Sequence, residues 1–287
     1  MGATFVRANG LRFAVLAEGP RDAPLALLLH GFPDHPGTFR HLAPRLVGVG
    51  FRVVAPWLRG YPPTEVPPDR HLDPDVFTAD VNALHRALGG TGRAVLVGHD
   101  WGAIAGARAA SAAPDRWRRL VTLAVPPEPV LRAALRDRAQ LRRSAYLFDA
   151  LIPGAPRRFG PRRVEALWRR WSPGYEPGPQ DLDAVRAMVN DRDSRRAMLA
   201  WYRGIARAAV AGRALSARSG VAPQPHLVLH GRDDGCIGAA YAERARTVLP
   251  NPLSRVEVLD GVGHWLHLEQ PDTIGALIVE HLRPALR

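Results

Sequence analysis

The apolar positions of the chain change their spacing several times, and this pattern predicts the elements of an α/β fold. Leu25–Leu29 is an unbroken apolar run of the kind found in strands buried on both faces of a sheet. Similar short runs predict strands at residues 11–17, 51–55, 94–97 and 120–124. Helical spacing at residues 76–88 and 102–113 separates them, and this alternation is typical of a mostly parallel sheet with helices on both faces.

The pattern changes from residue 126 to about residue 217. Strand signals vanish there, and Pro and Gly residues break arginine-rich helical segments. Strand runs return at 226–229 and 254–258, and a last helix is expected at 272–282. We therefore predict an α/β core formed by residues 1–125 and 218–287, interrupted by a helical cap at residues 126–217. Such an insertion is well placed to cover a site at the carboxyl edge of the sheet.

Composition narrows the class of protein. Hydrophobic residues make up 46% of the 287, which is enough for a packed core and excludes a disordered chain. The single cysteine, Cys236, excludes a disulfide framework and a cysteine-rich zinc module. No stretch approaches the roughly 18 uncharged apolar residues of a membrane span. The N-terminus lacks the apolar run of a signal peptide, so we expect a cytoplasmic protein.

Charge is distributed unevenly along the chain. All 39 basic residues are arginine, and the formal net charge is +12. Residues 126–217 hold 18 Arg against 9 Asp and Glu, and so carry +9 of that total. Codon bias explains why the cations are arginine but not why they gather in the predicted cap. No nucleic-acid-binding motif accompanies the charge, so we expect the cap to favour anionic or polar substrates, or an acidic partner.

The strongest local motif is GHDWG at residues 98–102, directly after one predicted strand and at the start of a helix. Small residues two positions before and after Asp100 allow the tight turn of a nucleophile elbow, which raises the central side chain. The alternative, an aspartate that only caps the helix, does not require both glycines. A carboxylate nucleophile attacks a strained or activated saturated carbon and forms an alkyl ester. Hydrolysis of that ester requires a general base and an oxyanion hole.

Candidates for both requirements follow other predicted strands. His264, in the loop GVGHW, is the expected general base, and His267 is the competing candidate that we expect on the following helix. Asp233 or Asp234, in GRDDG, can orient the imidazole, and the spacing favours Asp234.

The segment HGFP at residues 30–33 is the candidate oxyanion loop. We expect the backbone amides of Phe32 and Trp101 to form the oxyanion hole. We also expect His30, Pro33 and Trp265 to line the substrate pocket.

Taken together, the segments HGFPD, RGYPPTEVP, GHDWG, GRDDG and GVGHWLHLEQP resemble the α/β-hydrolase superfamily, in its epoxide-hydrolase-like branch with an aspartate nucleophile. The resemblance extends from Leu25 to about Pro271 and implies an α/β-hydrolase core with a helical cap. It also implies that two cap tyrosines protonate the epoxide oxygen. Tyr202, in the triplet Trp-Tyr-Arg, and Tyr146 stand at positions that look like these two. Asp149 departs from the family pattern, which often has an apolar or aromatic residue there.

The resemblance implies an epoxide hydrolase. The histidines form no H-E-x-x-H motif of a zinc site and no segment resembles a dinucleotide or phosphate loop, so we expect no metal and no cofactor. The nearest alternative is a haloalkane or haloacid dehalogenase, in which Trp101 would hold the halide, although Phe32 stands where dehalogenases commonly have asparagine. A catalytically silent binding protein of the same fold is the second alternative. The expected partner is a small-molecule substrate, with a homodimer left open and no nucleic acid or membrane expected.

Overall fold

The computed structural model describes residues 2–67, 72–152, 154–210 and 220–286. Its centre is an eight-stranded sheet with the order β1-β2-β4-β3-β5-β6-β7-β8. The strands are β1 (Thr4–Ala8), β2 (Leu11–Glu18), β3 (Leu25–Leu29), β4 (Arg52–Pro56), β5 (Ala94–His99), β6 (Trp117–Leu123), β7 (His226–Gly231) and β8 (Arg255–Leu259). From β3 to β8 all neighbouring strands are parallel, whereas β1 and β2 pair antiparallel at one edge. The predicted strands are confirmed, and β1 is an addition to them.

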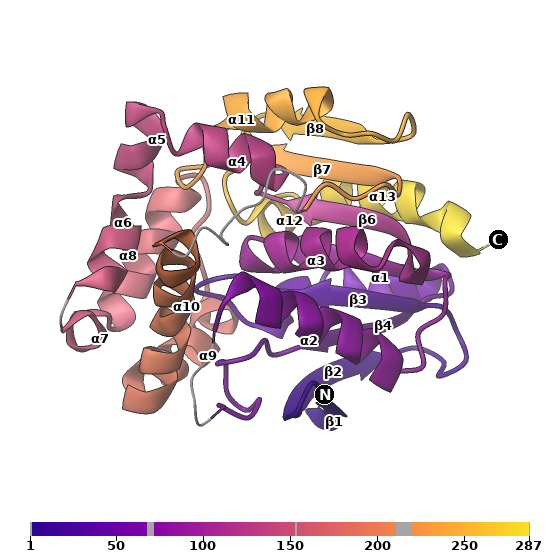
Figure 1. The fold of residues 1–287 in the computed structure, drawn as a ribbon, viewed down its shortest axis with the longest axis horizontal. Coiled ribbons are helices and arrows are strands. Elements are labelled where there is room, and N and C mark those ends of the chain that lie inside the picture. Colours follow the sequence, from indigo (N-terminus) through magenta and orange to yellow (C-terminus); the bar gives the residue numbers. More distant parts are fainter. Residues whose placement is uncertain (1, 68–71, 153, 211–219, 287) are drawn as a thin grey trace.

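Helices cover both faces of this sheet (Figure 1). Those of the core are α1 (Ala43–Gly48), α2 (Pro74–Ala87), α3 (Trp101–Ala112), α11 (Ala239–Arg244), α12 (Leu266–Glu269) and α13 (Pro271–Leu282). Short 3-10 turns add η1 (Pro36–Phe39), η2 (Pro114–Arg116), η3 (Ala245–Thr247) and η4 (Arg283–Leu286). None of the helices in the described parts of the chain is long and apolar enough to cross a bilayer.

The central strand β3 shows how the two faces are built. Leu25, Leu27 and Leu29 belong to the apolar cluster that also contains residues of α2 and α3. Ala26 and Leu28 belong to a second cluster, which contains residues of α1 and α13. Successive side chains of a strand point to opposite faces, so an unbroken apolar run supplies both cores at once.

Between β6 and β7 the chain forms helices, and we refer to this part as the insertion. It contains α4 (Glu128–Ala134), α5 (Arg138–Arg143), α6 (Ala145–Leu151), α7 (Ala155–Arg158), α8 (Pro161–Trp171), α9 (Pro179–Asn190) and α10 (Arg192–Val210). Figure 1 draws α5–α10 at the left end of the sheet, beyond the carboxyl ends of the parallel strands. The predicted end of this region, residue 217, lies outside the described residues.

Candidate active site

Asp100 occupies a sharp turn between β5 and α3. Its backbone angles, φ 50° and ψ −116°, lie in a region that non-glycine residues rarely adopt. The flanking glycines make room for this turn. A Cβ at Gly98 would lie 2.3 Å from the Gly102 carbonyl oxygen, and a Cβ at Gly102 would lie 2.0 Å from that of Leu29. Both positions therefore exclude any larger residue, and Asp100 has the geometry of a nucleophile elbow.

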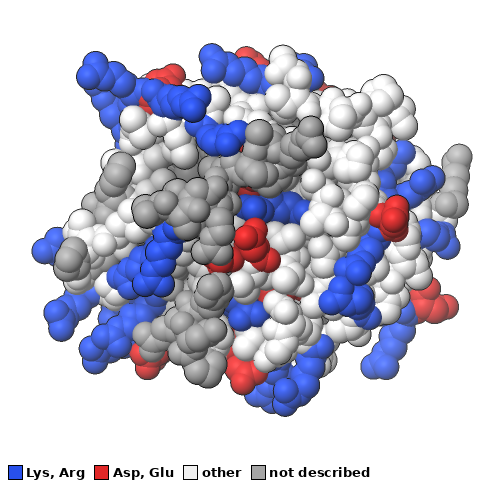
Figure 2. Space-filling view, in the orientation of Figure 1, with Lys and Arg blue, Asp and Glu red and all other residues white. Residues whose placement is uncertain are grey.

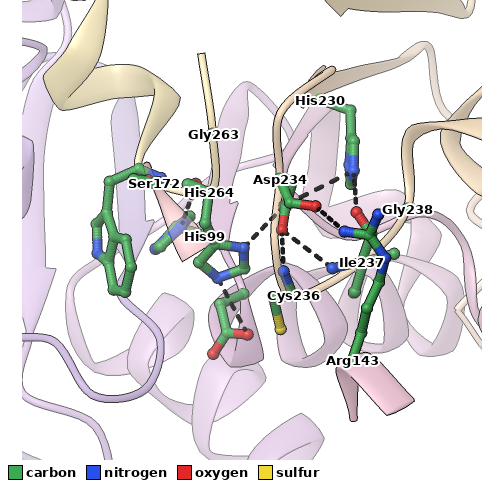
Figure 3. Close-up of polar contacts among 12 residues, drawn as sticks. His99, Arg143, Ser172, His230, Asp234, Cys236, Ile237, Gly238, Gly263 and His264 are labelled. Carbon is green, nitrogen blue, oxygen red and sulfur yellow. Dashed lines mark hydrogen bonds and ion pairs between the residues drawn. The ribbon is translucent and has the colours of Figure 1, made fainter. Parts of the chain in front are cut away.

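His264 lies between two carboxylates. Its Nδ1 is 2.9 Å from Oδ2 of Asp234, and its Nε2 is 3.6 Å from Oδ2 of Asp100. The imidazole is fully buried, and the side chain of Asp100 is 10% exposed. Figure 3 shows the His264 ring with one edge turned toward Asp234. The structure thus brings three predicted residues from the ends of β5, β7 and β8 into one contiguous group.

Asp234 is held from several sides. Its Oδ1 accepts hydrogen bonds from the amides of Cys236, at 2.6 Å, and Ile237, at 3.0 Å. Nε2 of His230 lies 3.6 Å from Oδ2. Asp233 is exposed, and its amide bonds to the Val262 carbonyl. Of the two aspartates that the sequence left open, only Asp234 contacts His264.

Electrostatics set the protonation of this group. Burial lowers the pKa of His264, but the nearby carboxylates of Asp234 and Asp100 more than offset it and raise that pKa to about 10. Burial also opposes the charged form of Asp234, yet the imidazolium of His264 holds the pKa of that carboxyl below its ordinary value. At neutral pH the resting site therefore contains an imidazolium between two carboxylates.

One of the two expected oxyanion-hole amides contacts the nucleophile. The amide of Phe32 donates to Oδ1 of Asp100 at 2.8 Å. Among the described residues we find no corresponding contact from the amide of Trp101. The side chain of Trp101 instead reaches the insertion, where its Nε1 donates to the hydroxyl oxygen of Tyr202 at 3.3 Å.

Both predicted tyrosines of the insertion lie beside this group. The rings of Tyr146 and Tyr202 meet edge to face, with centroids 5.8 Å apart, and Tyr202 meets Phe32 in the same way at 5.0 Å. The Tyr146 hydroxyl lies 3.6 Å from Sγ of Cys236. Burial raises the pKa of both phenols well above the ordinary value, so both stay protonated at neutral pH. The side chain of Asp149 lies outside the described residues.

A cavity of about 210 Å³ opens beside the two tyrosines. It is lined by Phe32, Tyr146, Ala150, Ile152, Arg158, Phe159, Arg163, Leu199 and Tyr202. The lining does not include the three residues that we expected there. Nε2 of His30 accepts the Leu58 amide, the carbonyl of Pro33 accepts Nε1 of Trp168, and Trp265 stacks on the Trp168 ring at 3.8 Å. The contacts of His30, Pro33 and Trp265 thus hold the surroundings of the site, and their role in a substrate pocket stays a prediction.

Contacts from the insertion also hold the two core loops. The carbonyl of Trp171 accepts hydrogen bonds from the amides of His264, at 3.0 Å, and Gly235, at 3.1 Å. Oγ of Ser172 accepts the Trp265 amide at 3.0 Å. Sequence reasoning missed Trp171 and Ser172, because they lie 60 to 100 residues from the loops they hold and no local motif marks them.

The same Ser172 hydroxyl donates to Glu269 at 2.7 Å, and the Glu269 carboxylate accepts the amide of Gly263. A Cβ at Gly263 would lie 2.6 Å from the Trp171 carbonyl oxygen, so this close approach requires glycine. Glu269 stands inside the segment GVGHWLHLEQP, which offered a signal for it.

Asp34, His99 and His267 form a buried cluster next to the site, with ligand atoms within 4.8 Å of one another. Such a set can hold a metal ion, but each member has a hydrogen-bonding role in the fold. Nε2 of His99 bonds to the His264 carbonyl, and Nε2 of His267 lies 2.6 Å from the Thr38 hydroxyl. His267 lies on α12 as expected, is 3% exposed and packs in the core, so it does not compete with His264 for Asp100.

Comparisons with known proteins agree with this geometry. Residues 24–271 match the family described as the alpha/beta hydrolase fold. Epoxide hydrolase A of Mycobacterium tuberculosis is 30% identical over 317 residues, which cover 96% of each chain. The crystal structure of epoxide hydrolase A from Mycobacterium thermoresistibile is 27% identical, with a TM-score of 0.70 and 98% of each chain covered.

A loop variant of a haloalkane dehalogenase from Bradyrhizobium elkanii has a TM-score of 0.80 at 22% identity, over 99% of this chain and 97% of that one. Because this likeness shows the fold alone, it does not separate the two chemistries. The family match, which covers most of the chain, and the 30% identity over nearly full length show that this protein belongs to the alpha/beta hydrolase fold family.

Proposed function

We propose that this protein is an epoxide hydrolase that opens an epoxide to a vicinal diol through an alkyl ester on Asp100. The observation that carries the proposal is the arrangement of two protonated phenols, Tyr146 and Tyr202, beside a carboxylate backed by His264 and Asp234. Relatives named as epoxide hydrolases support the same reaction. The expected compartment, the cytoplasm, and a homodimeric assembly remain predictions.

In the first step, Oδ2 of Asp100 attacks an epoxide carbon and the bond from that carbon to the ring oxygen breaks. Oδ1 is the oxygen held by the Phe32 amide, so it becomes the carbonyl oxygen of the ester. Trp101 donates to the Tyr202 oxygen, which leaves the phenol proton available for the ring oxygen. A phenol is a suitable acid because the alkoxide it protonates is far more basic.

In the second step, the ester removes the negative charge of Asp100, which had raised the pKa of His264. That pKa falls, so the imidazolium gives its proton to the tyrosinate left by ring opening. The resulting neutral imidazole takes a proton from water while hydroxide attacks Cγ of Asp100. The Phe32 amide stabilises the oxyanion. When the ester bond breaks, His264 returns its proton to the diol oxygen, and the proton of the new carboxylic acid passes to His264 and restores the imidazolium of the resting site.

The dehalogenase alternative is less compatible with the contacts of Trp101. A leaving halide requires side-chain N–H donors, and the indole N–H of Trp101 is directed to Tyr202. Phe32 supplies an aromatic ring at the position where a second donor would be needed.

The cavity beside the tyrosines indicates a compact substrate. Its volume of about 210 Å³ lies below the roughly 300–1,000 Å³ of drug-sized pockets, and aromatic and aliphatic side chains make up most of its lining. Arg158 and Arg163 also line it, which fits a substrate with an apolar epoxide end and a polar or anionic end.

A trapping experiment with His264→Gln tests the two-step scheme. This variant should still form the ester but not hydrolyse it, so incubation with styrene oxide or an aliphatic epoxide should add the mass of one epoxide to the protein. Peptide mapping should place the adduct on Asp100, and Asp100→Ala/His264→Gln should show none. If the wild-type enzyme forms diol from an epoxide while His264→Gln accumulates no adduct, the covalent mechanism is wrong. Halide release from haloalkanes in place of diol formation would favour the dehalogenase.

A further inference from the structure

A second cavity is separate from the one beside the tyrosines. It measures about 520 Å³ and lies between α7 and α10 of the insertion. None of its eleven lining residues is acidic. Six of them are arginines, namely Arg157, Arg192, Arg195, Arg196, Arg203 and Arg207. In Figure 2, basic side chains lie over the left of the molecule, where Figure 1 draws these helices, and further ones lie over the right.

Helix α10 accounts for the arrangement. Five of the six arginines lie on this helix. Arg192, Arg196, Arg203 and Arg207 follow one another at intervals of four, seven and four residues, and Arg195 lies three residues after Arg192, so this spacing places their side chains on one side of the helix. The opposite face is buried, with Met198, Trp201 and Tyr202 all at most 4% exposed. The same helix therefore presents Tyr202 to the candidate active site and a row of arginines to the second cavity.

The charge of this cavity is largely uncompensated by the described residues. Arg196 forms an ion pair with Asp193 at 3.7 Å, and the charge of Arg195 lies near the carboxylate of Asp191. Elsewhere on the protein, arginines such as Arg108 and Arg255 each contact two carboxylates. Within the described parts of the chain, the remaining four arginines of the cavity make no ion pair. So many cations around one cavity repel one another unless an anion binds among them.

We propose that this cavity binds a small anion that carries two or more phosphate groups. Guanidinium groups bind phosphate oxygens in pairs of parallel hydrogen bonds, and arginine is the residue best suited to this geometry. A single phosphate would leave most of the six charges unneutralised, whereas a di- or triphosphate group can contact several of them at once. The site is distinct from the cavity beside the tyrosines, since the two share no lining residue.

Isothermal titration of the full chain with tripolyphosphate tests the proposal, with orthophosphate and sodium chloride titrated at matched ionic strength. We expect saturable binding of about one tripolyphosphate per chain, weaker binding of orthophosphate and no comparable heat from chloride. Arg192→Gln/Arg203→Gln should weaken binding about 100-fold or more, because each hydrogen bond to a charged group contributes on the order of tenfold. Neither of these arginines makes an ion pair among the described residues, so the variant should fold.

The matched control is Arg138→Gln/Arg142→Gln, which removes the same charge from two exposed arginines of α5, outside the cavity. It should retain wild-type affinity for tripolyphosphate. Equal weakening in the two variants, or binding of many anions per chain, would show a diffuse effect of net charge and overturn the proposal. Absence of saturable binding to the wild-type chain would overturn it as well.

A third titration distinguishes the sources of the phosphate groups. Equal affinity for tripolyphosphate and for a nucleoside triphosphate identifies the phosphate chain as the recognised group. Tighter binding of the nucleotide, lost in Arg192→Gln/Arg203→Gln, assigns the site to nucleotides. If duplex DNA binds while neither small anion does, the surface recognises a long polyanion and the proposal is wrong.

Discussion

The core and the insertion hold their parts of the candidate site in different ways. At the strand ends, Asp100, His264 and Asp234 each make two or more polar contacts with protein atoms. On the insertion, the hydroxyls of Tyr146 and Tyr202 each make one contact among the described residues. The core therefore fixes the nucleophile and its base rigidly, whereas the phenols keep hydrogen-bonding capacity for a substrate. In the proposed reaction, the core therefore performs the covalent chemistry and the insertion selects the electrophile.

Removal of the nucleophile is the most severe test of the part assigned to the core. Asp100→Ala should lower kcat for epoxide opening by about 10⁴-fold or more, since loss of a residue from a catalytic group of this kind removes most of its effect. The rate is measured by chromatography of the diol product. Asp233→Ala, which alters an exposed aspartate that does not contact His264, is the control and should retain wild-type activity. Substantial activity in Asp100→Ala would contradict the ester mechanism.

Loss of the phenols tests the part assigned to the insertion. Tyr202→Phe and Tyr146→Phe should each lower the rate of ester formation by about 10²-fold, within the range of general acid catalysis, and the double variant should lose more. Hydrolysis of an ester already formed should change far less. Stopped-flow tryptophan fluorescence separates the two steps. If both variants slow only ester hydrolysis, the tyrosines do not act as acids for ring opening.

Protonation of His264 tests the coupling within the core. Asp100→Asn removes one of the two charges that raise the pKa of His264 to about 10, so that pKa should fall, as nitrogen-15 NMR of the imidazole can measure. The folded wild-type protein binds the extra proton between about pH 6.5 and pH 10, so the contribution to stability is full below pH 6.5 and is lost as pH rises through 10. Urea unfolding should show a smaller loss over this interval for Asp100→Asn. An unchanged pKa would contradict the assigned ion pair.

Loss of the Ser172 contact between the insertion and the core should have the smallest effect of these changes, and it should act on stability. Ser172→Ala removes the hydroxyl that joins Glu269 to the Trp265 amide, and should lower the free energy of unfolding by about 1–2 kcal/mol. Urea denaturation measures the change. Ser254→Ala, which removes the hydroxyl that accepts the His226 amide, provides the comparison. A drop in kcat for Ser172→Ala alone would show that this contact positions His264.

Local sequence patterns predicted much of the fold and the centre of the site. Apolar runs predicted the buried strands because a strand covered on both faces has little choice of residue. The edge strand β1 was not predicted, because its sequence TFVRA has no such apolar run and Phe5 is 47% exposed. Helix α1 was not predicted, because Pro44 and Gly48 interrupt its helical pattern of apolar residues.

Within the site, turn geometry made the nucleophile visible, since Gly98 and Gly102 are required by close backbone contacts. The pocket was not visible in the same way. Trp265 stacks on Trp168, nearly a hundred residues away, and the cavity is lined largely by the insertion. Such packing depends on how separate segments meet, which residue type and spacing do not determine.

Trp171 and Ser172 limit how this enzyme can be re-engineered. The carbonyl of Trp171 and the hydroxyl of Ser172 support the loops that carry His264 and Asp234, although both residues belong to the insertion by sequence. A chimaera that replaces the whole insertion with that of a relative would exchange part of the support of the triad along with the substrate-facing helices. Grafts that keep residues 171 and 172 and exchange only helices on either side would preserve the scaffold. The insertion is therefore not a separable module of this protein.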